Sequence, residues 1–173
     1  GDNLRVIEWM IARVKGEVRT SWITEPASGK VPAKPNTNVP FKGFGTFDTY
    51  ETRPLSERCI LFGRQAGPIM QNAIYNNNFQ FVQTPDTVMI LVEMVHEPRI
   101  IPIFASRQDV KYRPSVIKPW FGDSVGWYEG DTLVIETVNS HPKQRSFISP
   151  GGKVTERYTR WSDGQLFYEF KVE

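Results

Sequence analysis

The residues best suited to carry out chemistry are carboxylates placed within apolar, strand-like segments. Glu93 stands between Leu91 and Val95, and Glu136 stands between two valines. Side chains two positions apart on a strand share a face, so each carboxylate would lie among apolar side chains. A carboxylate in such a place is costly unless it is hydrogen-bonded, paired or protonated. These positions therefore predict either a structural partner or a raised pKa suited to general acid or base catalysis.

A purely structural explanation of the carboxylates stays open beside the catalytic one. One face of each strand is then solvated, or the acids form cross-strand pairs with arginine. For Glu93 and Glu136 the two interpretations are equally supported. For Glu156 and Glu169 the structural interpretation is favoured. The nearest plausible partners in the sequence are Arg99, Arg157 and His96.

His96 is the best candidate for proton transfer, because histidine titrates near neutral pH. A turn at Glu97-Pro98 would keep its imidazole close to the guanidinium of Arg99. The predicted catalytic group is His96 as proton shuttle, Glu93 as base or orienting partner, and Arg99 as anion or oxyanion stabiliser. The alternative, a histidine that caps a turn or bonds a carbonyl, is favoured for His96 taken alone. No paired metal-ligand spacing is present, so we predict neither a metal nor another cofactor.

Substrate-binding candidates combine amides, aromatic rings and acids near predicted turns. The amides precede a strand and offer donors and acceptors, although asparagine also favours turns for local reasons. The aromatic residues either line the mouth of a pocket or plug one end of a barrel. The predicted binding residues are Tyr75, Asn76, Asn78, Trp120, Asp123, Trp127 and Glu136.

The elements that would position these residues are strands joined by short turns. The expected strands are a meander over 79–84, 88–95 and 99–104, then the pairs 124–128 with 132–138 and 154–161 with 166–170. Gly-containing links of this length indicate hairpins, and no long helical segment separates the strands. The sequence predicts a mainly antiparallel all-β fold, a lipocalin-like β-barrel, with a sandwich as the alternative.

The N-terminal part is expected to be less regular. A helical period predicts a short helix over 3–14, followed by a hairpin over 18–31 with its turn at 26–29. Proline and glycine predict an exposed loop over 32–45, and 56–61 is expected to start a helical turn. We therefore predict one domain, 1–173, with an N-terminal part, 1–46, and a barrel core, 47–173.

Composition removes several classes of function. The net charge of +2 arises from 21 basic and 19 acidic residues spread along 173 positions, which argues against a nucleic-acid partner. No apolar run reaches the roughly 18 residues that span a membrane. The single cysteine excludes an intramolecular disulfide and leaves the redox compartment open. Aromatic residues make up 13%, which favours large stacking surfaces.

Three phrases carry a resemblance to a known family. They are Leu55-Ser-Glu-Arg-Cys59, Glu93-Met-Val-His96-Glu-Pro-Arg99, and the run from Trp120 to Thr137 that contains Gly-Asp-Ser and Glu-Gly-Asp. The chain resembles, over 47–173, a family of bacterial hypothetical proteins that are often exported. The resemblance implies membership without an activity, favours an exported or periplasmic location slightly over the cytoplasm, and implies a chain that continues past Glu173.

Two functions fit these features best. The first is a cofactor-independent enzyme that binds a hydrophobic or aromatic small molecule in a barrel pocket. It would catalyse an isomerisation, cyclisation or elimination by acid-base chemistry. The second is a lipocalin-like module that binds such a molecule without turnover. A structural or interaction domain that uses exposed aromatic residues is less favoured.

Overall fold

A computed structural model describes residues 13–19, 21–30, 48–60, 68–71, 75–144, 148–149 and 151–173. The chain divides into two compact units, 1–43 and 44–173. Among the described residues, no helix has the length and apolar character needed to cross a membrane.

The first unit contains a small hairpin. Strands β1 (Arg13–Val14) and β2 (Glu17–Val18) pair antiparallel. The helix predicted over 3–14 is not seen: its last two residues form β1, and the others lie outside the described residues. The predicted turn at 26–29 is confirmed by a hydrogen bond from Gly29 N to Pro26 O of 3.0 Å, whereas the strand expected before it does not form beyond Val18. The predicted loop over 32–45 lies outside the described residues.

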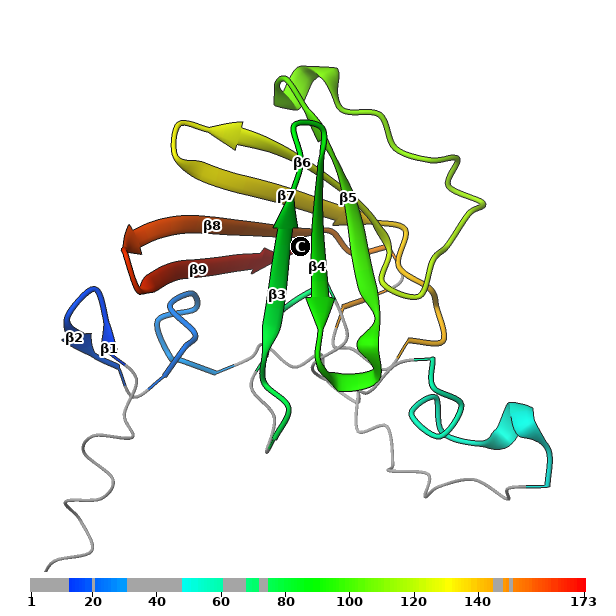
Figure 1. The fold of residues 1–173 in the computed structure, drawn as a ribbon. Coiled ribbons are helices and arrows are strands. Elements are labelled where there is room, and N and C mark those ends of the chain that lie inside the picture. Colours follow the sequence, from blue (N-terminus) through cyan, green and yellow to red (C-terminus); the bar gives the residue numbers. More distant parts are fainter. Residues whose placement is uncertain are drawn as a thin grey trace, which may run out of the picture. The chain divides into compact units, whose positions relative to one another are not determined.

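The second unit is built on one seven-stranded sheet in the order β3-β4-β5-β6-β7-β8-β9 (Figure 1). The strands are β3 (Phe79–Gln83), β4 (Thr87–Val92), β5 (Pro98–Phe104), β6 (Asp123–Glu129), β7 (Thr132–Val138), β8 (Val154–Ser162) and β9 (Gln165–Val172). Short 3-10 helices are η2 (Tyr50–Thr52), η3 (Met94–His96) and η4 (Arg107–Asp109). All seven predicted strands are confirmed, and backbone hydrogen bonds make a turn within 54–60, where a helical turn was expected.

One strand ends earlier than its apolar run predicts. Valine and methionine continue past Val92, but β4 stops there and η3 begins after Glu93. The residue Glu93 therefore precedes a helical turn and is not part of a strand face. His96 closes that turn with a φ of 56°, in the left-handed region.

The second departure from the sequence prediction is a parallel pair at the centre of the sheet. Strands β5 and β6 run parallel and pair through Ile103 with Gly126 and Phe104 with Trp127. The other neighbouring strands pair antiparallel. A parallel pair needs a long crossover, and the segment 105–122 supplies it. Two antiparallel blocks, β3–β5 and β6–β9, are thus joined by a short ladder.

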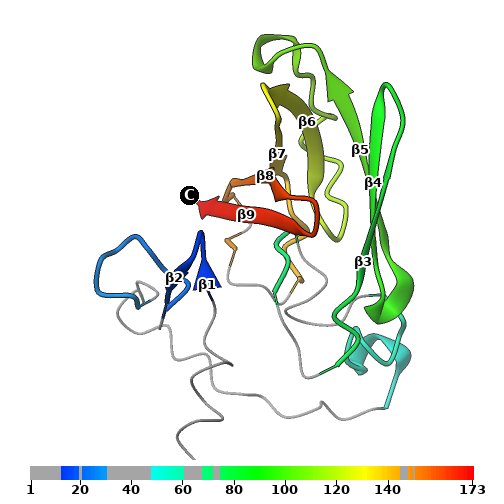
Figure 2. The ribbon, with the colours of Figure 1, turned by 60° about the vertical axis from the view of Figure 1, so that its left-hand side comes forward.

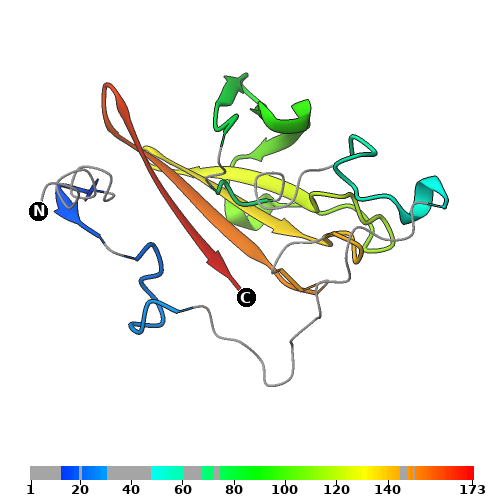
Figure 3. The same ribbon diagram turned by 90° about the horizontal axis from the view of Figure 1, so that it is seen from below.

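The sheet curls into a half-barrel. In Figures 2 and 3 the green strands β3, β4 and β5 turn away from the plane of the yellow-to-red strands β6 to β9. Among the described residues no ladder joins the edge strands β3 and β9. The all-β prediction is confirmed, and within the described part of the chain the barrel is half formed.

The concave face of the half-barrel carries the main core. Strand β4 alternates buried and half-buried residues, as a strand with one apolar face does. Buried side chains from β4, β5, β7 and β8 form one cluster: Val88, Ile90, Ile101, Leu133, Ile135 and Tyr158. Phe81 of β3 meets Tyr158 of β8 edge-on, with ring centroids 5.4 Å apart, so the two blocks touch across the concavity.

Gly122 fixes the entry into β6, and its replacement should be costly. Its φ is +80°, and an added Cβ would lie 2.6 Å from Thr137 Cγ2 and 2.8 Å from Val138 O. We expect Gly122→Ala to lower the free energy of unfolding by about 2–4 kcal/mol, from backbone strain and overpacking. Urea unfolding followed by circular dichroism measures the loss.

Gly130→Ala is the matched control. Gly130 also has a positive φ, +58°, but nothing lies within 4 Å of an added Cβ. Only the backbone term applies there, about 1 kcal/mol. Equal losses in the two variants would contradict the close packing around Gly122.

Candidate functional site

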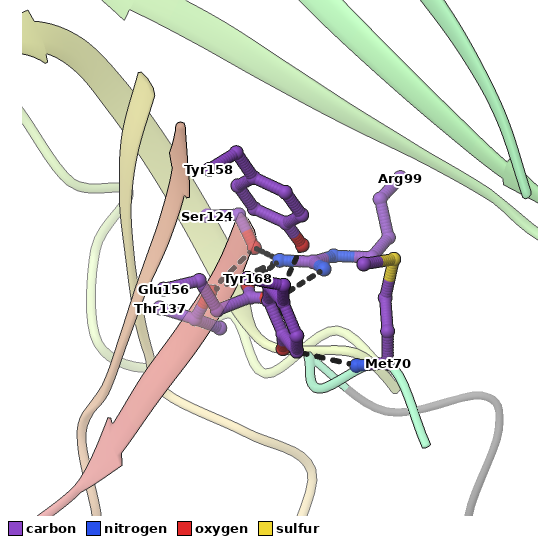
Figure 4. Close-up of polar contacts among 7 residues, drawn as sticks. All are labelled: Met70, Arg99, Ser124, Thr137, Glu156, Tyr158 and Tyr168. Carbon is purple, nitrogen blue, oxygen red and sulfur yellow. Dashed lines mark hydrogen bonds and ion pairs between the residues drawn. The ribbon is translucent and has the colours of Figure 1, made fainter. Parts of the chain in front are cut away.

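A buried ion pair between Arg99 and Glu156 lies at the centre of the candidate site (Figure 4). Arg99 Nη2 lies 2.6 Å from Glu156 Oε2, and Nη1 donates to Oε1 at 3.2 Å. Both side chains are almost fully buried, with 3% and 0% exposure. Arg99 comes from β5 and Glu156 from β8, so the pair spans the concave face. The geometry is the bidentate one that favours arginine over lysine.

The two charges are surrounded by further hydrogen bonds. Arg99 Nη2 also donates to Ser124 Oγ at 3.4 Å and to Thr137 Oγ1 at 3.5 Å. The hydroxyls of Tyr158 and Tyr168 donate to Glu156 Oε1 at 2.7 and 3.0 Å. Arg99 Nε, in contrast, is buried and has no acceptor among the described residues. Buried polar groups are normally bonded, so this cluster is close to saturated with one donor left over.

The electrostatics hold Arg99, Tyr158 and Tyr168 each in one protonation state near neutral pH. Desolvation lowers the pKa of Arg99, but the charge and hydrogen bonds of Glu156 outweigh it, so the pKa lies above the ordinary value. Desolvation, followed by the Glu156 charge, raises the pKa values of Tyr158 and Tyr168. Near neutral pH the arginine is charged and both tyrosines are neutral donors. The arginine and the two tyrosines are therefore suited to holding strands in place and not to exchanging protons.

A cavity of about 310 Å³ opens beside this cluster. Strands β5 and β6 pair only through the carboxyl end of β5 and the middle of β6, and residues from the amino ends of both strands line the cavity. Its walls are Glu97, Pro98, Arg99, Ile100, Arg113, Pro119, Trp120, Phe121, Gly122, Asp123 and Ser124. Trp120 stacks on His141, with centroids 4.0 Å apart and planes at 28°, so one face of its ring is occupied. The cavity combines aromatic rings with charged groups of both signs.

A second buried carboxylate, Glu136, holds the crossover on the convex face. The Tyr112 hydroxyl donates to Glu136 Oε1, and Arg107 Nη2 lies 2.9 Å from the same oxygen. Burial and this hydrogen bond raise the pKa of Tyr112. Nearby, Asp123 Oδ2 accepts from the backbone N of Arg113 at 2.6 Å. Glu136 thus has partners, as the structural interpretation required, and the crossover is tied down at two points.

No hydrogen bond or ion pair joins Glu93, His96 and Arg99, the predicted catalytic group, to one another. Glu93 Oε2 accepts from Asn78 N at 3.1 Å and from Asn78 Nδ2 at 2.8 Å. His96 is exposed, and Arg99 turns away to Glu156. Glu93 and Arg99 therefore form their hydrogen bonds with different partners, Asn78 and Glu156.

The predicted binding residues divide between several locations. Trp120 and Asp123 line the cavity. Trp127 is buried next to Arg107, whose guanidinium carbon lies 5.5 Å from the centroid of the ring. Tyr75 and Asn76 are exposed, and Asn78 serves Glu93.

Sequence reasoning did not select Tyr168 of the buried cluster or Glu97 of the cavity. For Glu156 a structural role, solvated or paired with arginine, was favoured; the side chain is 0% exposed and pairs with Arg99. Its alternation with Val154 and Tyr158 is the signal that pointed to burial. No sequence signal marked Tyr168 or Glu97. Among the described residues, no group of three or more histidine, cysteine or acidic side chains is placed to hold a metal ion.

Removal of Arg99 should be strongly destabilising, because Glu156 would remain buried without a cation. We expect Arg99→Met to lower the free energy of unfolding by about 3–5 kcal/mol. The double variant Arg99→Met/Glu156→Leu should regain much of this loss, since no buried charge remains. Chemical denaturation of the three proteins measures both effects.

Arg160→Met provides the control for that series. Arg160 and Asp163 form a pair of similar type, 3.0 Å apart, but both side chains are exposed. Exposed pairs contribute little, so unfolding should be nearly unchanged. Equal losses at Arg99 and Arg160 would disprove the special position of the buried pair.

Alkaline pH should unfold the protein through the two buried tyrosines. Their pKa values in the folded state lie above the unfolded value of 10.0. The stability they contribute is therefore present below about pH 10 and is lost as the pH rises beyond it. A titration that follows tyrosinate absorbance and circular dichroism together should show a late ionisation step coincident with unfolding. Ionisation of every tyrosine in a protein with native circular dichroism would contradict this expectation.

In comparisons with known proteins, no family model, curated protein or solved structure matched this chain. The family resemblance of the sequence therefore stays an expectation, and function has to be inferred from the geometry.

Proposed function

We propose that the chain binds a small organic molecule in the cavity that the amino ends of β5 and β6 help to line. The observation that carries the proposal is a cavity of about 310 Å³ with one wall anchored by a buried ion pair. Binding sites are typically concave, with apolar walls and a few placed polar groups. The proposed function is that of the binding module expected from the sequence, but the ligand lies at the junction of β5 and β6 and not in the lumen of a barrel.

The walls of the cavity are held in place before any ligand arrives. Arg99 fixes the β5 wall through Glu156, and the Arg113 N bond to Asp123 fixes the β6 wall. Walls that are already ordered reduce the entropy lost on binding. The volume lies at the lower limit of the roughly 300–1,000 Å³ of ligand sites, which favours a molecule of about one ring.

Acid–base turnover in the same cavity is the second candidate. Desolvation raises the pKa of Glu97, which lines the cavity, and perturbed carboxyl groups in clefts are candidates for proton transfer. The catalytic group predicted from the sequence, His96, Glu93 and Arg99, is less favoured, because Glu93 and Arg99 bond to different partners. Turnover would therefore centre on Glu97.

A fragment screen tests binding. The probes are one-ring aromatic amines, alcohols and acids at millimolar concentration, followed by ligand-observed and protein-observed nuclear magnetic resonance. We expect at least one probe to bind and to shift the signals of Trp120 and Phe121. New product signals on incubation would favour the enzyme candidate over simple binding.

Two tryptophan substitutions locate the bound fragment. Ile100→Trp adds bulk to a residue that lines the cavity, and should weaken binding about tenfold or more, a change of about 1.4 kcal/mol. Val116→Trp adds the same bulk at an exposed position outside the cavity and should leave affinity unchanged. The absence of any bound probe, or equal affinity in all three proteins, would overturn the proposal.

A further inference from the structure

The charges that line the cavity are unequally matched. Arg99 is paired with Glu156, and Arg113 Nε lies 3.6 Å from Asp123 Oδ1. Glu97 is different, because its carboxylate makes no hydrogen bond or ion pair with any described residue. Among the described residues, the cavity therefore has a carboxylate, that of Glu97, without a compensating partner.

From this imbalance we infer that the ligand is a protonated amine whose ammonium group contacts Glu97 and whose apolar part lies against Trp120 and Phe121. The inference rests on the proposed function, since it names the ligand class of the same cavity. An ammonium supplies a positive charge and hydrogen-bond donors, which are the groups that Glu97 lacks.

The position of Glu97 makes a cation more favourable than an ordinary surface carboxylate would. Its side chain is half-buried at the junction of η3 and β5, and its own carbonyl accepts a long bond of 3.5 Å from Val92 N. Desolvation raises the pKa of its carboxyl group. Burial has thus partly removed water from the Glu97 carboxylate, and no group within the described part of the chain takes the place of that water. A ligand cation would restore the lost interaction, whereas a ligand anion would be repelled.

The aromatic wall suits the other end of such a molecule. Phe121 is buried, with 7% exposure, and Trp120 is half-buried. Both line the cavity together with Pro98 and Pro119. Rings of this kind bury apolar groups and attract cations over their faces. A one-ring primary amine therefore meets a matching surface at both ends.

Benzylamine, benzyl alcohol and benzoate provide a matched set of probes, with one ring each and a positive, neutral or negative substituent. We expect the dissociation constant of benzylamine to be about tenfold lower than that of benzyl alcohol, as for a hydrogen bond between charged groups. Benzoate should bind most weakly. Titrations followed at the Trp120 and Phe121 signals give the three constants.

The variant Glu97→Gln removes the negative charge of the carboxylate and keeps the shape of the cavity. This variant should lose the preference for benzylamine and keep its affinity for benzyl alcohol. Glu169→Gln removes an exposed carboxylate that does not line the cavity, and should behave as wild type. A preference for benzylamine that persists in Glu97→Gln would overturn the inference.

The same titrations distinguish the two levels of the proposal. Equal binding of benzylamine and benzyl alcohol at the cavity signals would overturn the amine inference and leave the binding site standing. If none of the three probes binds while other fragments shift Trp120, the inference again fails alone. If no fragment of any charge binds, the proposed function fails with it.

Discussion

The interaction on which the rest of the structure depends is the buried pair of Arg99 and Glu156. Their side chains are 3% and 0% exposed and meet across the concave face of the sheet. The ladder between β5 and β6 contains two residue pairs, which is little to join two antiparallel blocks. The ion pair adds a second connection, from β5 to β8, and Phe81 with Tyr158 adds a third. The curl of the half-barrel follows from these contacts across the sheet.

The same pair explains why a cavity forms where it does. No ladder pair joins the amino ends of β5 and β6, and residues from both ends line the cavity. A buried pair is often no more stabilising than apolar side chains of the same size, but breaking it is costly. We therefore regard Arg99 and Glu156 as a positioning pair: they hold β5 in place relative to β8, and Glu97, two residues before Arg99, lines the cavity.

Local patterns in the sequence were sufficient for the strands and insufficient for the site. Alternation and Gly-containing turns predicted all seven strands of the sheet, because both are local properties. The parallel β5–β6 pair escaped prediction, since 105–122 crosses over without forming a long helix. Alternation correctly placed Glu136 and Glu156 among apolar residues. Their partners Tyr112 and Arg99 lie 24 and 57 positions away, and local patterns do not show which distant residues the fold brings together. Glu93 was wrongly placed on a strand because β4 ends before its apolar run does, and His96 lies at the end of the helical turn that follows.

The most direct test is residue-by-residue amide hydrogen exchange in wild type and in Arg99→Lys. Lysine keeps the charge but loses the bidentate contact with Glu156. If the ion pair couples the two blocks, amides of β3, β4 and β5 will exchange faster in the variant, while those of β6 to β9 will stay close to wild type. Equal acceleration in both blocks, or none in either, would contradict the coupling that the ion pair is held to provide.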